Sequence, residues 1–75
     1  MEINRVEGII ESILFTMGDS VELSKIALAI GHDEDTTRRI IHCMMDKING
    51  AEERGVKIIE LEDSFQMCTK AESYE

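Results

Sequence analysis

The sequence predicts a small α+β domain, mostly helical, with three helices followed by a two-stranded hairpin. Apolar residues first recur at steps of three and four and then, after Gly55, at every second residue. Glycine and acidic or hydroxyl residues stand where helices are expected to end and begin. The chain has 75 residues, which is enough for one domain, so we assign residues 1–75 to a single domain.

The first predicted helix spans residues 2–17 and ends at Gly18. Its expected core stripe is Ile3, Val6, Ile10, Ile13, Leu14 and Met17. Ile9 and Phe15 lie outside this stripe, one on each flank, and widen the apolar surface. Both can simply be buried within the domain. The sharper hypothesis is that one flank packs on the core and the other on a second chain, which makes Ile9 and Phe15 candidate interface residues.

Two more helices are expected in the middle of the chain. Residues 21–23 form a short extended bridge, and Ser24 is a suitable N-cap for a brief helix over residues 25–30. Asp33 is the expected N-cap of a long helix over residues 34–53.

The long helix carries two rows of residues at helical spacing. The expected core row is Thr37, Ile40, Ile41, Met44, Ile48 and Ala51. The row expected to face outward is Arg38, His42, Met45 and Asn49. Met45 is the apolar member of the outward row, and it is therefore our third candidate interface residue.

The end of the chain predicts a hairpin. Val56–Leu61 and Ser64–Thr69 alternate as strands around a Glu62-Asp63 turn. Helix, short helix, turn, long helix and hairpin is the order of a winged helix-turn-helix, with the hairpin as its wing. Residues 70–75 resemble the opening turn of a further helix, so we expect the natural chain to continue.

Charge argues against nucleic acid as a partner. Sixteen acidic and eight basic residues give a formal net charge of −8, which repels phosphate backbones. In the long helix Asp33, Glu34 and Asp35 come before the first arginines, Arg38 and Arg39. We expect Arg38 to pair with Glu34 and Arg39 with Asp35. Direct DNA binding is therefore not expected.

Targeting signals are also missing from the sequence. No apolar run approaches the roughly 18–20 residues that a membrane helix needs, and the N-terminus has no basic region followed by an apolar stretch. We therefore expect a cytoplasmic protein with no membrane contact.

Residues with catalytic or metal-binding potential are few and badly spaced. Cys43 and Cys68 lie far apart and fit no common zinc module. We expect a buried thiol at Cys43, a half-buried strand thiol at Cys68, and solvated histidines at His32 and His42. Neither cysteine has an evident basic neighbour to lower its pKa, which weakens the alternative of a redox sensor. No phosphate loop or nucleophile motif is present, so the sequence predicts a non-enzyme without cofactor or metal.

One segment of the sequence is more specific than the general architecture and resembles a known family. Residues 10–21 contain Ile-Leu-Phe at the end of a helix, followed by Gly18-Asp19 and a hydrophobic residue. This passage resembles the N-terminal end of bacterial segregation and condensation protein B. The likeness continues through residues 23–31, residues 54–56 at the entry of the first wing strand, and residues 64–70 at the second wing strand and exit.

The chain departs from that family's pattern in two places. Ser20 stands where the family usually has proline, and the wing turn Glu62-Asp63 is acidic where glycines are common. These differences bear on the shape of the wing more than on membership of the family.

The resemblance implies a non-enzymatic subunit of the prokaryotic SMC condensin complex, which acts in chromosome condensation and segregation. It further implies two tandem winged helices, of which this domain is the first, and homodimerisation through this domain. The implied partners are the kleisin subunit, segregation and condensation protein A, and through it the SMC ATPase. The alternative from another class is a fragment of a dimeric winged-helix DNA-binding transcription regulator.

Overall fold

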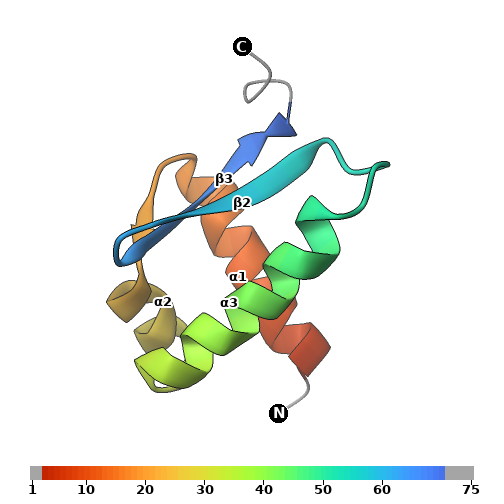
Figure 1. The fold of residues 1–75 in the computed structure, drawn as a ribbon. Coiled ribbons are helices and arrows are strands. Elements are labelled where there is room, and N and C mark those ends of the chain that lie inside the picture. Colours follow the sequence, from red (N-terminus) through yellow and green to blue (C-terminus); the bar gives the residue numbers. More distant parts are fainter. Residues whose placement is uncertain (1–2, 71–75) are drawn as a thin grey trace.

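The structure is a computed structural model that describes residues 3–70 of the chain. Its elements are α1 (Ile3–Met17), β1 (Val21–Glu22), α2 (Leu23–Ile30), α3 (Glu34–Asn49), β2 (Val56–Leu61) and β3 (Ser64–Thr69) (Figure 1). The winged helix-turn-helix order predicted from the sequence is confirmed. The further helix expected at the end of the chain lies outside the described residues, apart from Lys70.

The sheet has one strand more than predicted. Its strands lie in the order β1-β3-β2, and both pairings are antiparallel. The bridge expected at residues 21–23 is in part a strand, in which Val21 pairs with Phe65 and Glu22 with Ser64. A segment of two residues is too short to show a strand pattern in the sequence. It is a strand here because it pairs with β3.

Two helix bounds differ from the prediction. Helix α2 begins at Leu23, directly after β1, and its N-cap is Glu22, whose side chain makes no capping hydrogen bond. Ser24 therefore lies inside the helix. The wing turn takes the place of a side-chain cap at the start of α2: the Leu23 N–H donates a hydrogen bond to the Asp63 carbonyl at 2.7 Å. Helix α3 ends at Asn49, before Gly50, and not at residue 53.

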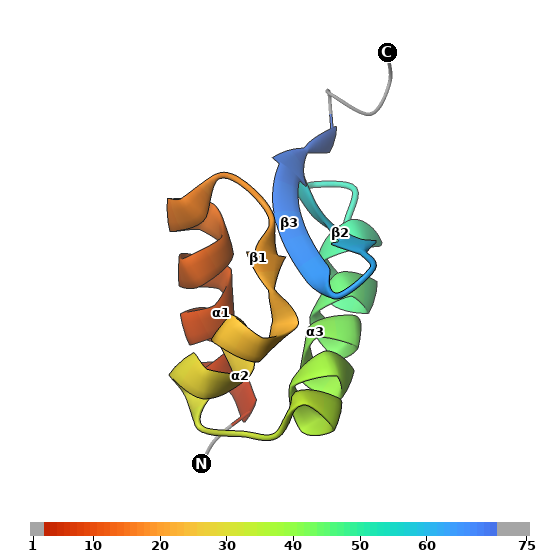
Figure 2. The ribbon, with the colours of Figure 1, turned by 90° about the vertical axis from the view of Figure 1, so that its left-hand side faces the viewer.

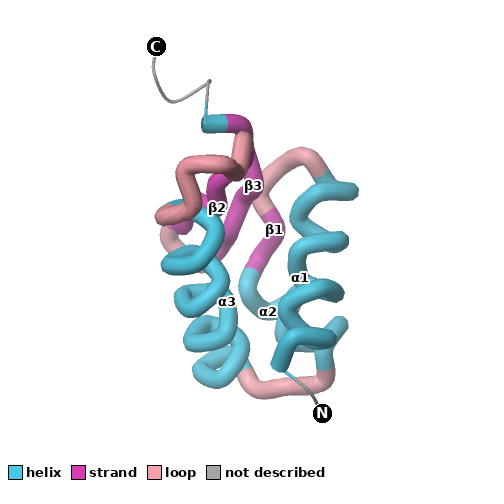
Figure 3. Tube along the Cα trace, turned by 90° about the vertical axis from the view of Figure 1, so that its right-hand side faces the viewer, coloured by secondary structure: helices cyan, strands magenta, loops and turns pink. Residues whose placement is uncertain are grey.

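The core lies between the helices and the inner face of the sheet. Figures 2 and 3 show α1 and α3 running side by side with the strands rising between them. The largest fully buried side chains are Phe65, Ile10, Leu14, Ile26, Ile41, Ile58, Val6 and Thr37. Most members of the predicted core rows are buried, namely Val6, Ile10, Leu14, Thr37, Ile40, Ile41, Met44 and Ile48. Ile13 is half-buried against the core, Met17 is 56% exposed, and Ala51, which lies beyond the end of α3, is half-buried. The burial of Ile3 lies outside the part of the chain that the structure describes.

The row of α3 that was expected to face solvent instead faces β2. The Asn49 side chain donates to the Ile58 carbonyl and accepts from the Ile58 N–H, both at 2.9 Å. Ile58 is fully buried, so this pair of bonds satisfies a backbone unit at the point where the wing meets the end of α3.

Asp33 begins α3 as predicted. Its carboxylate accepts hydrogen bonds from the Thr36 hydroxyl at 2.7 Å and from the Thr36 N–H at 2.9 Å. The hydroxyl bond and then the backbone bond to the charged carboxylate hold the pKa of Asp33 below its ordinary value. The cap is therefore strongest when Asp33 is ionised.

Replacement of Asn49 by alanine leaves the Ile58 backbone without its partner. We expect Asn49→Ala to lower the free energy of unfolding by about 1–3 kcal/mol, the usual penalty for an unsatisfied buried backbone group. Urea unfolding followed by circular dichroism measures this loss. Asn49→Asp keeps an acceptor for the Ile58 N–H and should lose less; wild-type stability in the alanine variant would contradict the anchoring role of Asn49.

Acid should remove the contribution of Asp33 to stability. A lowered pKa in the folded state means that this contribution is present at neutral pH and is lost as the pH falls through the lowered pKa. Asp33→Asn keeps an acceptor but no charge. It should unfold at lower urea than wild type at neutral pH, with the difference vanishing in strong acid. A difference that does not change with pH would rule out the charge of the cap as its source.

Candidate protein interface

Residues 3–70 contain no arrangement suited to a metal. No group of three or more histidine, cysteine or acidic side chains in this range comes close enough to hold an ion. Cys68 is half-buried as expected, but Cys43 is exposed and not buried. At 100° per residue, Cys43 lies more than about 100° from the centre of the core row of α3, which turns it towards solvent.

The part of the chain that the structure describes contains no helix long and apolar enough to cross a membrane.

Arg38 and His42 of α3 face the wing and bond to acidic residues of that wing. Arg38 bonds through Nη1 to Glu60 Oε2 and through Nη2 to Asp63 Oδ1, the latter at 3.3 Å. His42 Nε2 lies 2.9 Å from Glu60 Oε1. The expected pair of Arg38 with Glu34 is therefore wrong, because the wing brings Glu60 and Asp63 closer than a neighbour on the same helix. His42, expected to be solvated, is half-exposed and bonded.

This pairing bears directly on nucleic-acid recognition. A winged helix that reads DNA uses the start of its third helix in the major groove and lysines or arginines on phosphates. Here Arg38 already has two carboxylates, and Glu34 and Asp35 stand in the first turn of α3. A phosphate would have to displace these carboxylates, in a domain of formal net charge −8.

Apolar side chains are exposed on both flanks of α1. Ile9 is 40% exposed and Phe15 is 74% exposed. They are six positions apart along the helix, so the two side chains point about 120° apart. They therefore belong to two separate surfaces and not to one.

The first surface, which we name the Ile9 flank, consists of Ile9, Ser12, Ile13, Thr16 and Met17. The last four of these residues line a shallow, open hollow of about 320 Å³. Ile13 is half-buried against the core, and its outer side continues the flank. Met17 was expected in the core, and its exposure is what extends the flank to the end of α1.

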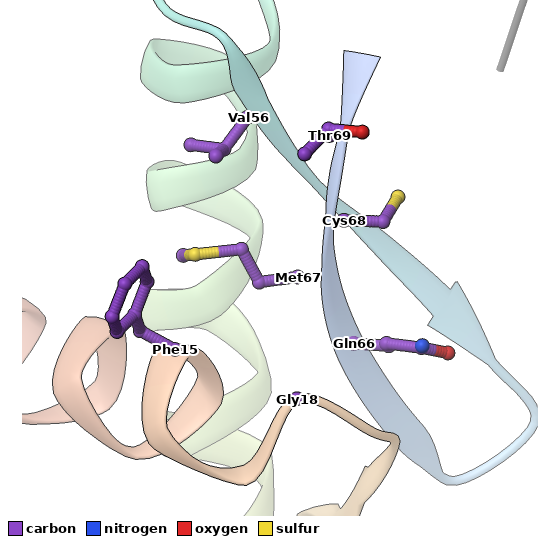
Figure 4. A pocket seen from close by; sticks show the side chains of 7 residues that line it. All are labelled: Phe15, Gly18, Val56, Gln66, Met67, Cys68 and Thr69. Carbon is purple, nitrogen blue, oxygen red and sulfur yellow. The ribbon is translucent and has the colours of Figure 1, made fainter. Parts of the chain in front are cut away.

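The second surface, the Phe15 groove, lies between the end of α1 and the sheet. It has a volume of about 210 Å³ and is lined by Phe15, Gly18, Val56, Gln66, Met67, Cys68 and Thr69 (Figure 4). Figure 4 shows Phe15 and Met67 pointing into the same space, with Val56 beyond them. Of these residues, only Phe15 was a candidate from the sequence.

Met45, the third candidate, is half-buried and packs against the core. It therefore offers less free surface than Ile9 or Phe15. The sequence analysis did not single out Leu28 of α2, which is 84% exposed, or Leu61 beside the wing turn, which is 45% exposed. On the helical wheel Leu28 lies about 160° from the buried Ile26 and Ile30. Helical periodicity alone could therefore have predicted that Leu28 points away from the core.

The fold and these surfaces define an acidic winged-helix domain with apolar patches exposed on its surface. The family model described as segregation and condensation complex subunit ScpB matches residues 8–75, and the chain belongs to this family. The resemblance noted in the sequence is thereby confirmed.

Relatives that carry the name segregation and condensation protein B match along the whole chain. The protein of Lachnoclostridium phytofermentans is 63% identical over 75 residues, which cover 100% of this chain and 39% of the relative. That of Acetivibrio thermocellus is 36% identical over 75 residues, or 38% of its length. The chain thus spans about two fifths of the length of these relatives.

Solved structures agree with the fold. A crystal structure of a dimer of an ScpB N-terminal domain complexed with an ScpA peptide superposes with a TM-score of 0.85 at 30% identity, covering 96% of this chain and 89% of that one. ScpB from Mycobacterium tuberculosis gives a TM-score of 0.84 at 16% identity over 99% of this chain and 46% of its own. The second likeness supports the fold alone.

The domain should not bind DNA. We expect no change in the fluorescence anisotropy of a mixed-sequence duplex, even at low salt, because Arg38 is held by Glu60 and Asp63. The double variant Glu60→Gln, Asp63→Asn releases Arg38 and should bind weakly at low salt. Micromolar binding by the wild-type chain with a steep salt dependence would contradict this prediction.

Proposed function

We propose that this chain is the first winged-helix domain of a non-enzymatic subunit of the prokaryotic SMC condensin complex. The subunit acts in chromosome condensation and segregation in the cytoplasm, by forming a homodimer and by binding the kleisin, segregation and condensation protein A. Through the kleisin it joins the SMC ATPase. The observation that carries the proposal is the exposed Ile9 flank on an acidic domain of this family.

Two physical features support self-association through the Ile9 flank. A domain this small buries a smaller fraction of its surface than a larger one, so its own core contributes modest stability. Ile9, Ile13 and Met17 leave apolar surface open to water. A second copy would remove that surface from water at about 25 cal/mol per Å².

The relatives support the choice of partners. The related N-terminal domain with 30% identity was crystallised as a dimer with an ScpA peptide. The two apolar surfaces of this chain lie on different flanks of α1, so one protomer has room for a second copy on the Ile9 flank and for a peptide elsewhere. The alternative of a DNA-binding regulator has less support, because Arg38 is paired with the wing.

A charge on the Ile9 flank should dissociate the homodimer. We expect Ile9→Asp to weaken self-association at least about tenfold, because a carboxylate would be buried without a partner. Sedimentation velocity over a concentration series measures this change, and circular dichroism confirms that the variant is folded.

Leu28→Asp is the matched control, since it places the same charge on an exposed apolar residue outside the flank. It should leave self-association unchanged. A folded Ile9→Asp protein that dimerises like wild type would exclude this flank as the interface.

A further inference from the structure

Within the described residues, four of the six residues of strand β3 have no strand beside them on the β1 side. Strand β1 pairs only with Ser64 and Phe65, whereas β2 pairs with β3 along its whole length. Within residues 3–70, no strand continues β1 beside residues 66–69. An unpaired strand edge is a template for another extended chain.

Two backbone hydrogen bonds establish which groups face this free edge. The Asp63 carbonyl accepts from Leu23 on the β1 side, and the Lys70 N–H donates to the Gly55 carbonyl on the β2 side. Backbone groups of an antiparallel strand alternate between its two neighbours. The N–H and C=O groups of Met67 and Thr69 therefore point towards the free edge, and those of Gln66 and Cys68 point towards β2.

The free edge borders the Phe15 groove. Residues 66–69 all line the groove, together with Phe15, which is 74% exposed. Figure 4 shows the Phe15 ring beside the Met67 side chain, while Gln66 and Cys68 project to the other side of the strand. Backbone donors and acceptors thus lie directly beside an apolar hollow of about 210 Å³.

We propose that an extended segment of the kleisin binds here as an additional strand, in line with β1. Its backbone pairs with the N–H and C=O groups of Met67 and Thr69, and one of its apolar side chains enters the Phe15 groove. Pairing supplies affinity and the hollow supplies selectivity for the side chain. This inference rests on the proposed function and assigns its kleisin contact to a place on the domain.

A slim peptide fits this edge better than a second folded copy. The free stretch is only four residues long, and Phe15 and Gly18 stand beside it. A strand must come within about 4.8 Å of β3 to pair with it, and an extended segment can do so without bringing helices with it.

Amide hydrogen exchange distinguishes this mode of binding from others. We would follow residue-resolved exchange by NMR on the 75-residue chain, alone and with purified segregation and condensation protein A. The amides of Met67 and Thr69 should exchange at least about tenfold more slowly in the complex, because each gains a hydrogen bond. The Gln66 and Cys68 amides, already directed towards β2, should change little.

Two pairs of variants test the contact by affinity. Thr69→Pro removes the N–H at the free edge and spares the bonds to β2, and Thr69→Val keeps that N–H as its control. Phe15→Ser removes the wall of the groove, and Phe15→Leu keeps an apolar wall. Proline and serine should each weaken kleisin binding about tenfold, with near wild-type affinity in the two controls.

Self-association, measured in parallel by sedimentation, separates the possible results. Wild-type binding that is lost in Thr69→Pro and Phe15→Ser, with dimerisation intact, supports the proposal. Kleisin binding that is unaffected by both variants overturns it while the proposed function stands. If the wild-type chain does not bind the kleisin, the proposed function fails at that step. Protection of Met67 and Thr69 by self-association alone would identify a second copy as the occupant and overturn the proposal.

Discussion

The pairing of β3 with both of its neighbours holds this domain together. Strand β3 places Phe65, which is fully buried, opposite Val21 on one side and Glu60 on the other. Through these pairs the segment between α1 and α2 is tied to the wing, and the wing closes over α3. Because β1 supplies only two residues, β3 is paired on that side at Ser64 and Phe65, and within residues 3–70 its remaining four residues have no strand beside them there.

The contact between α3 and the wing engages the side chains that a DNA-reading winged helix would leave free. At one end of the contact between α3 and β2, the Asn49 side chain hydrogen-bonds to the backbone of the buried Ile58. Near the other end, Arg38 and His42 both bond to Glu60. The exposed ion pairs of Arg38 contribute little stability each. Their effect is on recognition, since they occupy the arginine that a DNA-reading winged helix would direct to phosphate.

The two flanks of α1 expose different apolar surfaces. Ile9 and Phe15 were equivalent in the sequence, as apolar residues beside a core stripe. In the structure Ile9 lies on an open helix flank, whereas Phe15 overhangs a groove that is completed by Val56 and Met67. The proposed homodimer contact and the proposed kleisin contact therefore use different flanks of one helix, because the sheet meets only one of them.

The sequence by itself determined the helices, the hairpin and the acidic character of the domain, because periodicity, the Asp33 cap and net charge are local or additive properties. It also carried enough of the Ile-Leu-Phe to Gly18-Asp19 passage to indicate the family. Only the tertiary structure decided that residues 21–22 form a strand, that Arg38 pairs with Glu60, and that Phe15 faces Met67. Each of these joins residues more than twenty positions apart, and such contacts depend on how the elements pack and not on any pattern within one of them.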